Sequence, residues 1–550
     1  MLDRNALFSR LSSTTYDLIV VGGGITGAGI ARDASLRGLK VALFEKNDFA
    51  WGTSSRSSKL VHGGFRYLEH YEFGLVMESL RERLTLMRIA PHNVHPLPFF
   101  IPVFKGEKPP SILLRLGLIA YEYLSFGKRV GGRKWYSPKK AIKMFPFIKQ
   151  EGLKGVGQYF DCNMNDARLC MENILATIEN GSVCLNYCAV TELTKDQGKL
   201  TGVVITDQET GNKLTVKASA VVNASGPWSD ITKSLDDSSA KKRLANAKGV
   251  HIITKRIIED NKALAIPLKD GRITFVLPFK DKYTLIGTTD TFYDGDLENV
   301  VCEPEEADYL LEGYNNFFPN RKLEKSDIIS SYAGVRPLVY DEKHGASSSD
   351  VSREHKIFED PSGLITIVGG KYTTYRKMGK RITDLVVKKL KHEKKLPKQI
   401  NNCMTDKVPL PGGRIPDKKN WQNYEDITSD QLVNDYEVDE EQARLLLRSY
   451  GTNAEHVLNY AKEDPSLYAK IIPTESYMLV EVKYCIHNEY CRSMVDFFWL
   501  RTFMALETDF TAGIDAVAKI FQRELQWSAQ KVEEEKQNVV DRLQIAQFKN

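Results

Sequence analysis

The hydrophobic pattern is most regular over Asp17–Glu45, where two short apolar runs enclose a cluster of glycines and an amphipathic stretch. The first run, Leu18–Val21, is short and rich in β-branched residues, so it predicts a buried strand. A helix is expected to begin near Thr26 and to continue through Arg37, and Val41–Phe44 predicts a second strand. Strand, helix and strand in this order form a βαβ unit with a parallel sheet.

Three glycines after the first strand match the G-x-G-x-x-G spacing of dinucleotide-binding proteins. Gly22 makes the tight turn, Gly24 lets the backbone approach a pyrophosphate, and Gly27 lets the helix pack closely on the strand. The helix N-terminus offers free N–H groups and a positive dipole end to the pyrophosphate. Glu45 follows at the spacing of an acid that accepts a ribose hydroxyl, which disfavours a 2′-phosphate. The motif therefore predicts FAD or NAD and argues against NADP.

The middle of the chain alternates between helical and strand patterns. Helical spacing over Leu75–Ile89 predicts a packing helix, and residues 155–245 return to strand patterning with a hairpin that turns near Gly211. Alternating runs over Gly249–Leu338 predict an antiparallel sheet above the cofactor. Another buried strand, Leu364–Val368, precedes two glycines from which a second helix can point at the cofactor.

Both ends of the chain differ from this core pattern. Met1–Thr15 is expected to be a short polar lead-in, and Lys407–Pro416 a linker. Beyond the linker the pattern is helical: Asp439 is placed to cap a helix that ends before Gly451, and Tyr477–Leu500 keeps an apolar face.

The formal charge of +5 conceals a local excess of basic residues. Residues 101–150 carry eleven Lys or Arg against two acids, a net charge of +9, so the rest of the chain sums to −4. In the same segment apolar residues at positions 112, 113, 116, 119, 120 and 124 form one helical face. Such a basic amphipathic helix can lie in a bilayer interface and attract anionic lipid. The alternative is a buried helix under a basic surface.

The eight cysteines form neither a C-x-x-C pair nor the Cys/His spacing of a zinc site, so we expect reduced thiols and no metal. No signal peptide and no apolar run of about eighteen residues is found. These features predict a cytoplasmic protein with no nucleic-acid partner.

The loop Asn47–Tyr67 is dense in Gly and Ser and too polar for a core. A loop around the phosphates or the isoalloxazine ring of a cofactor needs small hydrogen-bond donors and a few larger side chains, and this loop contains both. The alternative is a flexible loop on the surface. The donors are Thr53, Ser54, Ser55, Ser57 and Ser58, and the larger side chains are Lys59, His62, Arg66 and Tyr67.

The stretch GTSSRSSKLVHGGFRYLEHYEF in this region resembles the FAD-dependent glycerol-3-phosphate dehydrogenases, which have the D-amino-acid-oxidase-like flavoprotein fold. The blocks NMNDARL, VVNASGPWSD, LIGTTDT, YAGVRPL, SREHKIF and GLITIVGGKYTTYRKM extend the resemblance over Asp17–Met378. The choice of FAD over NAD rests on this resemblance.

The resemblance implies an α/β fold with a Rossmann-like FAD-binding domain, an antiparallel-sheet substrate domain and a C-terminal α-helical domain. The expected FAD-binding domain is discontinuous, over residues 1–98, 151–248 and 351–402. Residues 99–150 are expected to form the basic, membrane-facing insert, residues 249–350 the substrate domain, and residues 403–550 the helical domain. The expected cofactor-binding residues are Gly22, Gly24, Gly27, Glu45, Thr53, Ser54, Ser55, Ser58, Lys59, His62, Gly226, Gly370, Lys371 and Thr373.

Oxidising a phosphorylated secondary alcohol requires a proton acceptor and a grip on the phosphate. By resemblance, Arg336 and Arg353 form the phosphate clamp, and Arg66, Tyr67 and Lys371 complete the substrate pocket. The catalytic candidates are His62, Lys371 and Arg336. Histidine as a residue type can exchange a proton near neutral pH, so His62 is the first choice of base. Lys371 is the second, and Arg336 is a poor base because arginine stays protonated. Stabilising the reduced flavin anion is an alternative role for these cations.

The implied reaction moves a hydride from C2 of sn-glycerol 3-phosphate to FAD and gives dihydroxyacetone phosphate. The expected electron acceptor is a membrane quinone, reached from a peripheral position on the inner face of the cell membrane. A peroxide-forming glycerol-3-phosphate oxidase, a redox-inert membrane-docked FAD-binding module and an amino-acid oxidase are the alternatives. A homodimer is one possible assembly.

Overall fold

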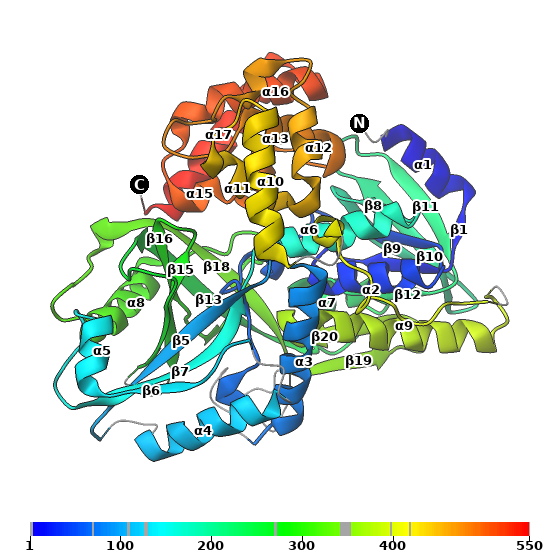
Figure 1. Cartoon of the computed structure of the whole chain (residues 1–550). Coiled ribbons are helices and arrows are strands. Elements are labelled where there is room, and N and C mark those ends of the chain that lie inside the picture. The colour runs from blue at the N-terminus through cyan, green and yellow to red at the C-terminus, as the bar shows by residue number, and fades with distance from the viewer. Residues whose placement is uncertain are drawn as a thin grey trace.

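The computed structural model describes residues 4–68, 71–106, 110–125, 130–268, 272–340, 354–396, 399–416 and 420–548, without the side chain of Arg66. Figure 1 shows an α/β half around α2, a large curled sheet beside it, and a group of C-terminal helices over the junction between them. The fold class predicted from the sequence is confirmed.

The α/β half is built on a six-stranded sheet in the order β19-β20-β12-β2-β3-β8. The pairs β20–β12, β12–β2, β2–β3 and β3–β8 are parallel, and β19 is antiparallel to β20. The strands are β2 (Leu18–Val21), β3 (Val41–Phe44), β8 (Val183–Leu185), β12 (Val221–Asn223), β19 (His355–Glu359) and β20 (Ile365–Gly369). The predicted βαβ unit is confirmed, with α2 (Ile25–Leu36) between its strands.

Helices α2, α6 (Asp166–Glu179) and α9 (Tyr375–His392) accompany this sheet (Figure 1). Small residues bring α2 and α9 together: a Cβ added at Gly29 would lie 2.7 Å from the Tyr375 ring, and one at Gly379 would lie 2.7 Å from the Gly29 carbonyl oxygen. The two ends of the FAD-family resemblance therefore meet along one pair of helices.

A smaller sheet in the order β1-β11-β10-β9 flanks this half. Its strands are β1 (Thr15–Tyr16), β9 (Cys188–Asp196), β10 (Lys199–Asp207) and β11 (Lys213–Ala218). The predicted hairpin near Gly211 is confirmed, since β10 and β11 pair antiparallel across it. The polar lead-in is wrong: Arg4–Ser13 forms α1, because Leu11 is buried and Arg4 Nη2 bonds Asp207 Oδ1 at 2.7 Å.

The large sheet runs in the order β17-β13-β16-β15-β14-β5-β7-β4, with β18 paired to β13 and β6 paired to β7. It is antiparallel throughout except for the parallel pair β14–β5. The strands are β4 (Leu60–Val61), β5 (His95–Phe104), β6 (Lys134–Tyr136), β7 (Leu153–Asn163), β13 (Leu244–Lys255), β14 (Ala263–Pro267), β15 (Ile273–Phe279), β16 (Tyr283–Gly287), β17 (Thr291–Phe292) and β18 (Ile328–Val339). The antiparallel sheet predicted over Gly249–Leu338 is confirmed.

This sheet also contains strands from outside the range predicted for the substrate domain. Phe99–Phe104, expected to begin the amphipathic insert, forms the end of β5 and is buried against β7 and β14. The helices beside the sheet are α3 (Phe73–Ile89), α4 (Ser111–Leu124), α5 (Pro138–Met144) and α8 (Pro304–Phe317). The predicted packing helix over Leu75–Ile89 is confirmed as α3.

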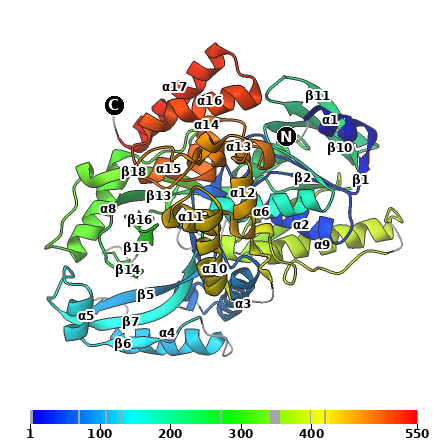
Figure 2. The same ribbon diagram turned by 45° about the horizontal axis from the view of Figure 1, so that its top comes forward.

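Helix α4 buries one face and exposes the other. Leu114, Leu118 and Tyr121 are buried against the sheet and the loop before it. The exposed large hydrophobic side chains are Ile112, Leu113, Leu116, Ile119 and Tyr123. Figures 1 and 2 both draw α4 at the end of the molecule opposite α16. Over the described ranges, no helix has both the length and the apolar character to cross a bilayer.

The C-terminal region, expected as a helical domain over residues 403–550, is described as helical from residue 420 to residue 548. Its helices are α10 (Trp421–Asp435), α11 (Glu440–Tyr450), α12 (Ala454–Asn459), α13 (Leu479–Asn488), α14 (Met494–Asp496), α15 (Met504–Glu507), α16 (Ile514–Leu525) and α17 (Ala529–Ala546), with a π-helical turn at Phe497–Arg501. The predicted cap is confirmed, because the Asp439 side chain accepts a hydrogen bond from Gln442 N at 2.8 Å. The apolar side chains expected over Tyr477–Leu500 are buried, but the helix that carries them is not continuous, because α13 ends at Asn488 and Tyr490 adopts a left-handed conformation with φ of 56°.

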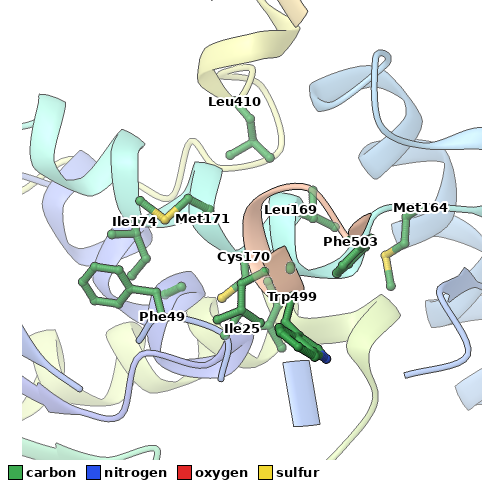
Figure 3. Packing of buried hydrophobic residues seen from close by; sticks show 14 of the residues in the cluster. Ile25, Phe49, Met164, Leu169, Cys170, Met171, Ile174, Leu410, Trp499 and Phe503 are labelled. Atoms are coloured by element: carbon green, nitrogen blue, oxygen red, sulfur yellow. The ribbon is translucent and has the colours of Figure 1, made fainter. Parts of the chain in front are cut away.

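The domain shares one hydrophobic core with the rest of the protein. Figure 3 shows Trp499 and Phe503 of the domain in the same packed cluster as Ile25 of α2 and Leu169 of α6. The eight cysteines, all within the described ranges, are free thiols. The helical domain is therefore packed into the core.

A buried acid on α13 makes stability depend on pH. Burial raises the pKa of the Glu481 carboxyl from its ordinary value of 4.5 to about 7. The folded protein then holds this proton more tightly than the unfolded chain, so the free energy of unfolding falls as pH rises from 4.5 to about 7. Glu481→Gln retains an acceptor for Met478 N and removes the titration. We expect the variant to be the more stable protein at pH 8, by roughly 1–3 kcal/mol, measured by urea unfolding.

The control is Glu534→Gln, at an exposed acid on α17 whose side chain bonds Gln530. It should keep the pH dependence of the native protein. An equal pH dependence in Glu481→Gln and the native protein would contradict the burial argument.

Candidate functional site

A cavity of about 820 Å³ lies between the six-stranded sheet and the large sheet. Its wall contains the segments that follow β2, β3, β12 and β20, together with inward-facing residues of β13 and β18. Ligands in parallel α/β sheets bind at the carboxyl ends of the strands, and this cavity occupies that position. The fold thus joins the dinucleotide motif and the large sheet in one site.

The glycine turn forms one end of the cavity. Gly22 and Gly24 line it, and Gly22 has φ of +108° with no room for a Cβ, which would lie 2.7 Å from the Ala224 carbonyl oxygen. A Cβ at Gly27 would lie 1.9 Å from the Gly22 carbonyl oxygen. Gly22 and Gly27 therefore meet the steric requirements expected from the motif. Ile25 N at the start of α2 donates to Ser54 Oγ at 2.8 Å, which fastens the serine loop to the helix N-terminus.

Glu45 lines the cavity at the end of β3. Its carboxylate accepts hydrogen bonds from Gly23 N at 2.7 Å and Asn47 N at 3.0 Å. Burial raises the pKa of this carboxyl in the present structure. Each oxygen retains a second lone pair, so the carboxylate can also accept a ribose hydroxyl.

The Gly/Ser loop is an ordered wall of the cavity, which argues against the surface-loop alternative. Thr53 Oγ1 donates to the Val335 carbonyl of β18, and Ser57 Oγ donates to Asp166 Oδ2 at 2.6 Å. Thr53, Ser54, Ser57 and Ser58 line the cavity. These hydrogen bonds to β18 and to the first residue of α6 hold the loop in place.

Four of the expected cofactor residues do not line the cavity: Gly27, Ser55, Lys59 and Thr373. Lys59 is buried, and its Nζ lies 2.8 Å from Asp166 Oδ1 because the loop turns at this residue with φ of 55°. Thr373 Oγ1 accepts a hydrogen bond from His62 N at 3.2 Å. The structure therefore places these two residues behind the wall, where they fix its shape. Gly226 and Gly370 do line the cavity.

The cavity wall carries several cations from distant parts of the chain. Arg336 of β18 donates to Thr288 Oγ1 at 3.0 Å and to the Thr289 carbonyl at 3.3 Å. The Arg336 guanidinium lies against Gly249, which has no side chain. A Cβ added at Gly249 would lie 2.3 Å from Arg336 Nη2. Lys371 Nζ lies 3.4 Å from the centroid of the Tyr67 ring. His62, Tyr67, Arg336 and Lys371 all line the cavity, as the sequence grouped them.

Two predicted substrate residues lie outside this description. Arg353 is not among the described residues, and only the backbone of Arg66 is described. The role of Arg353 in the phosphate clamp and the role of Arg66 in the substrate pocket remain predictions.

The structure adds residues that the sequence interpretation missed. His251 of β13 lines the cavity, its Nε2 lies 2.8 Å from Ser58 Oγ, and its ring stacks on Tyr332 at 4.8 Å. Burial and the nearby Arg336 hold the pKa of His251 well below its ordinary value, so this imidazole stays neutral. The available signal was a histidine within the apolar run HIIT, two residues after Gly249.

Two further charged residues on the wall, Arg272 and Asp290, were also missed. Arg272 Nη1 donates to the Asp290 carbonyl at 3.3 Å, and Asp290 Oδ1 lies 3.4 Å from Arg336 Nη1. Arginine and aspartate in surface-like loops give no sequence signal that would separate them from solvated charges. Among the described residues, no cluster of three His, Cys, Asp or Glu side chains could hold a metal ion.

Comparison with known proteins agrees with this site. Residues 17–376 match the family described as FAD dependent oxidoreductase, and residues 403–532 match the C-terminal domain of alpha-glycerophosphate oxidase. The chain is 38% identical over 506 residues to an aerobic glycerol-3-phosphate dehydrogenase of Staphylococcus epidermidis, covering 90% of this chain and 88% of that protein. It is 36% identical to the Bacillus subtilis protein of the same name, covering 96% and 95%.

A solved structure is similar over nearly the whole chain. The glycerol-3-phosphate dehydrogenase from Bacillus halodurans complexed with FAD superposes with a TM-score of 0.82 at 32% identity, covering 99% of this chain and 98% of that one. The similarity therefore includes the α/β half, the large sheet and the C-terminal helices.

Proposed function

Because the chain belongs to the FAD-dependent glycerol-3-phosphate dehydrogenase family, we propose that it oxidises sn-glycerol 3-phosphate to dihydroxyacetone phosphate with FAD as its cofactor. The observation that carries this proposal is the cavity itself. Its glycine and serine segments form a cradle for a dinucleotide, and the same cavity presents Arg336, Lys371 and His62 to a small anionic alcohol.

The residues present fit FAD. Gly22, Gly24 and the N-terminus of α2 would hold the pyrophosphate, since a Cβ at Gly22 would collide with the Ala224 backbone and α2 begins directly at the turn. The Glu45 carboxylate would accept a hydrogen bond from a hydroxyl group of the adenosine ribose. Ser54 and Ser58 would lie along the cofactor, and Gly370 leaves the backbone accessible beside it. When bound, FAD supplies the acceptor for the hydride on C2 of the substrate.

The cations that line the cavity suit a phosphate. Arginine grips phosphate through two parallel N–H groups and stays charged, whereas a lysine acts as a point charge. Arg336 and Lys371 carry these roles in our proposal, with Arg272, Arg353 and Arg66 as further members. An amino-acid substrate would need one arginine for its carboxylate, so several cations favour a phosphate.

We propose that a histidine acts as the base and accepts the proton of the substrate hydroxyl. His62 lines the cavity and its backbone is anchored to Thr373, which keeps the ring near the serine loop. Lys371 is the second candidate, and the neutral imidazole of His251 is a third. Comparing His62→Asn and His251→Asn with the native protein tests the assignment. The base is the residue whose loss lowers the rate of flavin reduction by about 100-fold or more. A native rate of flavin reduction in both variants would exclude both histidines.

Anaerobic mixing of the yellow protein with sn-glycerol 3-phosphate tests the proposed reaction. We expect bleaching of the flavin absorbance, followed by rapid recovery on adding a short-chain quinone and slow recovery with oxygen. Absence of bleaching would contradict the substrate and favour the redox-inert module. Fast recovery with oxygen and release of peroxide would identify an oxidase instead.

We propose a membrane quinone as the electron acceptor, and a peripheral position on the cytoplasmic face of the cell membrane. Support comes from α4, which exposes Ile112, Leu113 and Leu116 beside a basic surface. The basic side chains that are exposed in the same part of the chain are Lys105, Arg115, Arg133, Lys134, Lys139, Lys140 and Lys143. An apolar face beside cations fits the interface of an anionic bilayer. Lys108, Lys128 and Arg129 of this basic segment lie outside the described residues.

The double variant Ile112→Asp/Leu116→Asp should weaken binding to anionic vesicles by about tenfold or more, because two apolar side chains no longer enter the interface. Vesicle co-sedimentation measures the effect. Anaerobic reduction by substrate should be unchanged, since α4 is not part of the cavity wall.

Ile427→Asp is the matched control, at an exposed isoleucine of α10 in the helical domain. It should leave vesicle binding intact. Equal vesicle binding by the α4 variant and the native protein would remove the support for this membrane face.

The proposal also includes a homodimer. Light scattering of the protein without vesicles distinguishes this homodimer from a monomer.

A further inference from the structure

The segment from Glu45 to Trp51 has two faces. Glu45, Lys46, Asn47 and Trp51 line the cofactor cavity. Asp48, Phe49 and Ala50 are buried on the other side, with exposed fractions of 2% or less. The C-terminal helical domain packs against this buried face. The domain itself contributes no described residue to the cavity wall.

Asp48 is gripped by an arginine of the helical domain. Arg501 Nη1 lies 2.7 Å from Asp48 Oδ2, and Arg501 Nη2 lies 3.1 Å from Asp48 Oδ1. The same Nη2 donates to the Glu489 carbonyl at 2.8 Å, which fixes the guanidinium. A bidentate pair of buried ions defines position and direction more strictly than apolar packing does. This pair therefore fixes segment 45–51 relative to the π-helical turn that carries Arg501.

Two aromatic contacts extend the grip along the segment. The Phe49 ring meets the Tyr490 ring edge to face, with centroids 6.1 Å apart. The Arg542 guanidinium of α17 lies 4.3 Å from the centroid of the Trp51 ring, and Trp51 belongs to the cavity wall. Figure 3 shows Phe49 within the packed cluster that contains Trp499 of the π-helical turn.

The opposite side of the segment is tied to the glycine turn. Gly23 N donates to Glu45 Oε2 at 2.7 Å, and Ala50 N donates to the Gly23 carbonyl at 3.1 Å. Ala50 has φ of 64°, a left-handed conformation that alanine seldom adopts without support from its surroundings. Any shift of the helical domain would therefore be transmitted to Glu45, Trp51 and the turn that would hold the pyrophosphate.

We propose that the C-terminal helical domain supports the wall of the cofactor cavity from behind, so that docking of this domain and binding of FAD are thermodynamically coupled through segment 45–51. Asp48, Arg501 and Arg542 are positioning residues in this arrangement, because they act on FAD through Glu45 and Trp51. The proposal deepens the proposed function and rests on its cofactor.

The first test measures FAD affinity of Arg542→Met by titrating apoprotein with FAD and following flavin fluorescence. Loss of the cation beside Trp51 should weaken FAD binding by about threefold to tenfold. Arg542→Lys keeps a cation and should restore affinity to within about twofold. Arg523→Met, on α16 with surface ion pairs to Glu524 and Asp464, is the control and should bind FAD normally.

A merely structural role for Arg542 would lower the stability of the apoprotein, so urea midpoints are compared without FAD. We expect the apoprotein midpoints of Arg542→Met and Arg523→Met to agree. A lower apoprotein midpoint for Arg542→Met with unchanged FAD affinity would overturn the proposal.

Coupling is reciprocal, so FAD should in turn protect the helical domain. Hydrogen exchange of the wild-type apoprotein and holoprotein should show slower exchange with FAD in residues 489–501 and 529–546. Asp48→Asn, which keeps the side-chain volume, should lose most of this protection in residues 489–501. Equal hydrogen-exchange rates with and without FAD in both segments would overturn the proposal. These measurements use no substrate, so a holoprotein that fails to react with glycerol 3-phosphate would count against the proposed function alone.

Discussion

Arg336→Lys is expected to lower kcat/KM for sn-glycerol 3-phosphate by about 100-fold or more, chiefly through a higher KM. Loss of a partner from a desolvated charged hydrogen bond costs about 2–5 kcal/mol, and about 1.4 kcal/mol corresponds to a factor of ten. The native guanidinium is held by Thr288 and Thr289 in the space above Gly249. Lysine keeps the charge and loses the planar fork, so both the orientation and the second hydrogen bond to phosphate disappear.

Steady-state kinetics with two substrates separates this role from general damage. Glycerol lacks the phosphate, so its slow oxidation should be equal in Arg336→Lys and the native protein. Arg444→Lys is the matched control, at an arginine of α11 that pairs with Asp426 and Glu440 away from the cavity. Unchanged KM for glycerol 3-phosphate in Arg336→Lys would remove Arg336 from the phosphate clamp. A proportional loss with glycerol would instead indicate a distorted site.

Gly27→Ala is the second variant with a large expected effect, and it should abolish retention of FAD. The added Cβ would lie 1.9 Å from the Gly22 carbonyl oxygen and 3.3 Å from Val20 Cγ1. The first neighbour is backbone, so relief requires moving either α2 or the glycine turn. Overpacking of this kind costs about 1–3 kcal/mol or more. The same movement displaces Gly24 from the position at which the pyrophosphate would bind.

The ratio of flavin to protein absorbance after purification, together with urea unfolding, measures both consequences. Gly74→Ala is the control, because a Cβ at this position in the first turn of α3 has no neighbour within 4 Å. It should retain flavin and be equally stable or slightly more stable. Normal flavin content in Gly27→Ala would show that the turn and helix can separate without cost, against the close packing described above.

Local patterns predicted the elements whose stabilising interactions are local. Leu18–Val21 and Val41–Phe44 are strands in the structure because a strand inside a parallel sheet is buried on both faces and therefore has a short, continuous apolar sequence. The cap at Asp439 was predictable because its partner lies three residues away. The serine loop was recognised because Gly and Ser have few other uses at such density, and FAD followed from the family resemblance.

The errors and omissions concern contacts between distant parts of the chain. Helix α1 is stabilised by an ion pair between Arg4 and Asp207 and by burial of Leu11 in the core. These partners lie far away in the chain, so the sequence of the first fifteen residues does not reveal them. Phe99–Phe104 was grouped with the amphipathic helix because an apolar run does not say whether a sheet or a bilayer covers it. β5 has partners in β7 and β14, which follow it by tens of residues in the chain.

The sequence by itself determined the βαβ dinucleotide unit, the serine loop, the antiparallel strands and the helical nature of the C-terminal region, because periodicity and capping act within a few residues. Only the tertiary structure decided that His251 and Arg272 share a wall with His62, Arg336 and Lys371. It also decided that Arg501 and Arg542 reach the back of segment 45–51. Such contacts arise from which buried faces and charges meet when the sheets and helices pack together, and a linear pattern of residue types does not encode those distances.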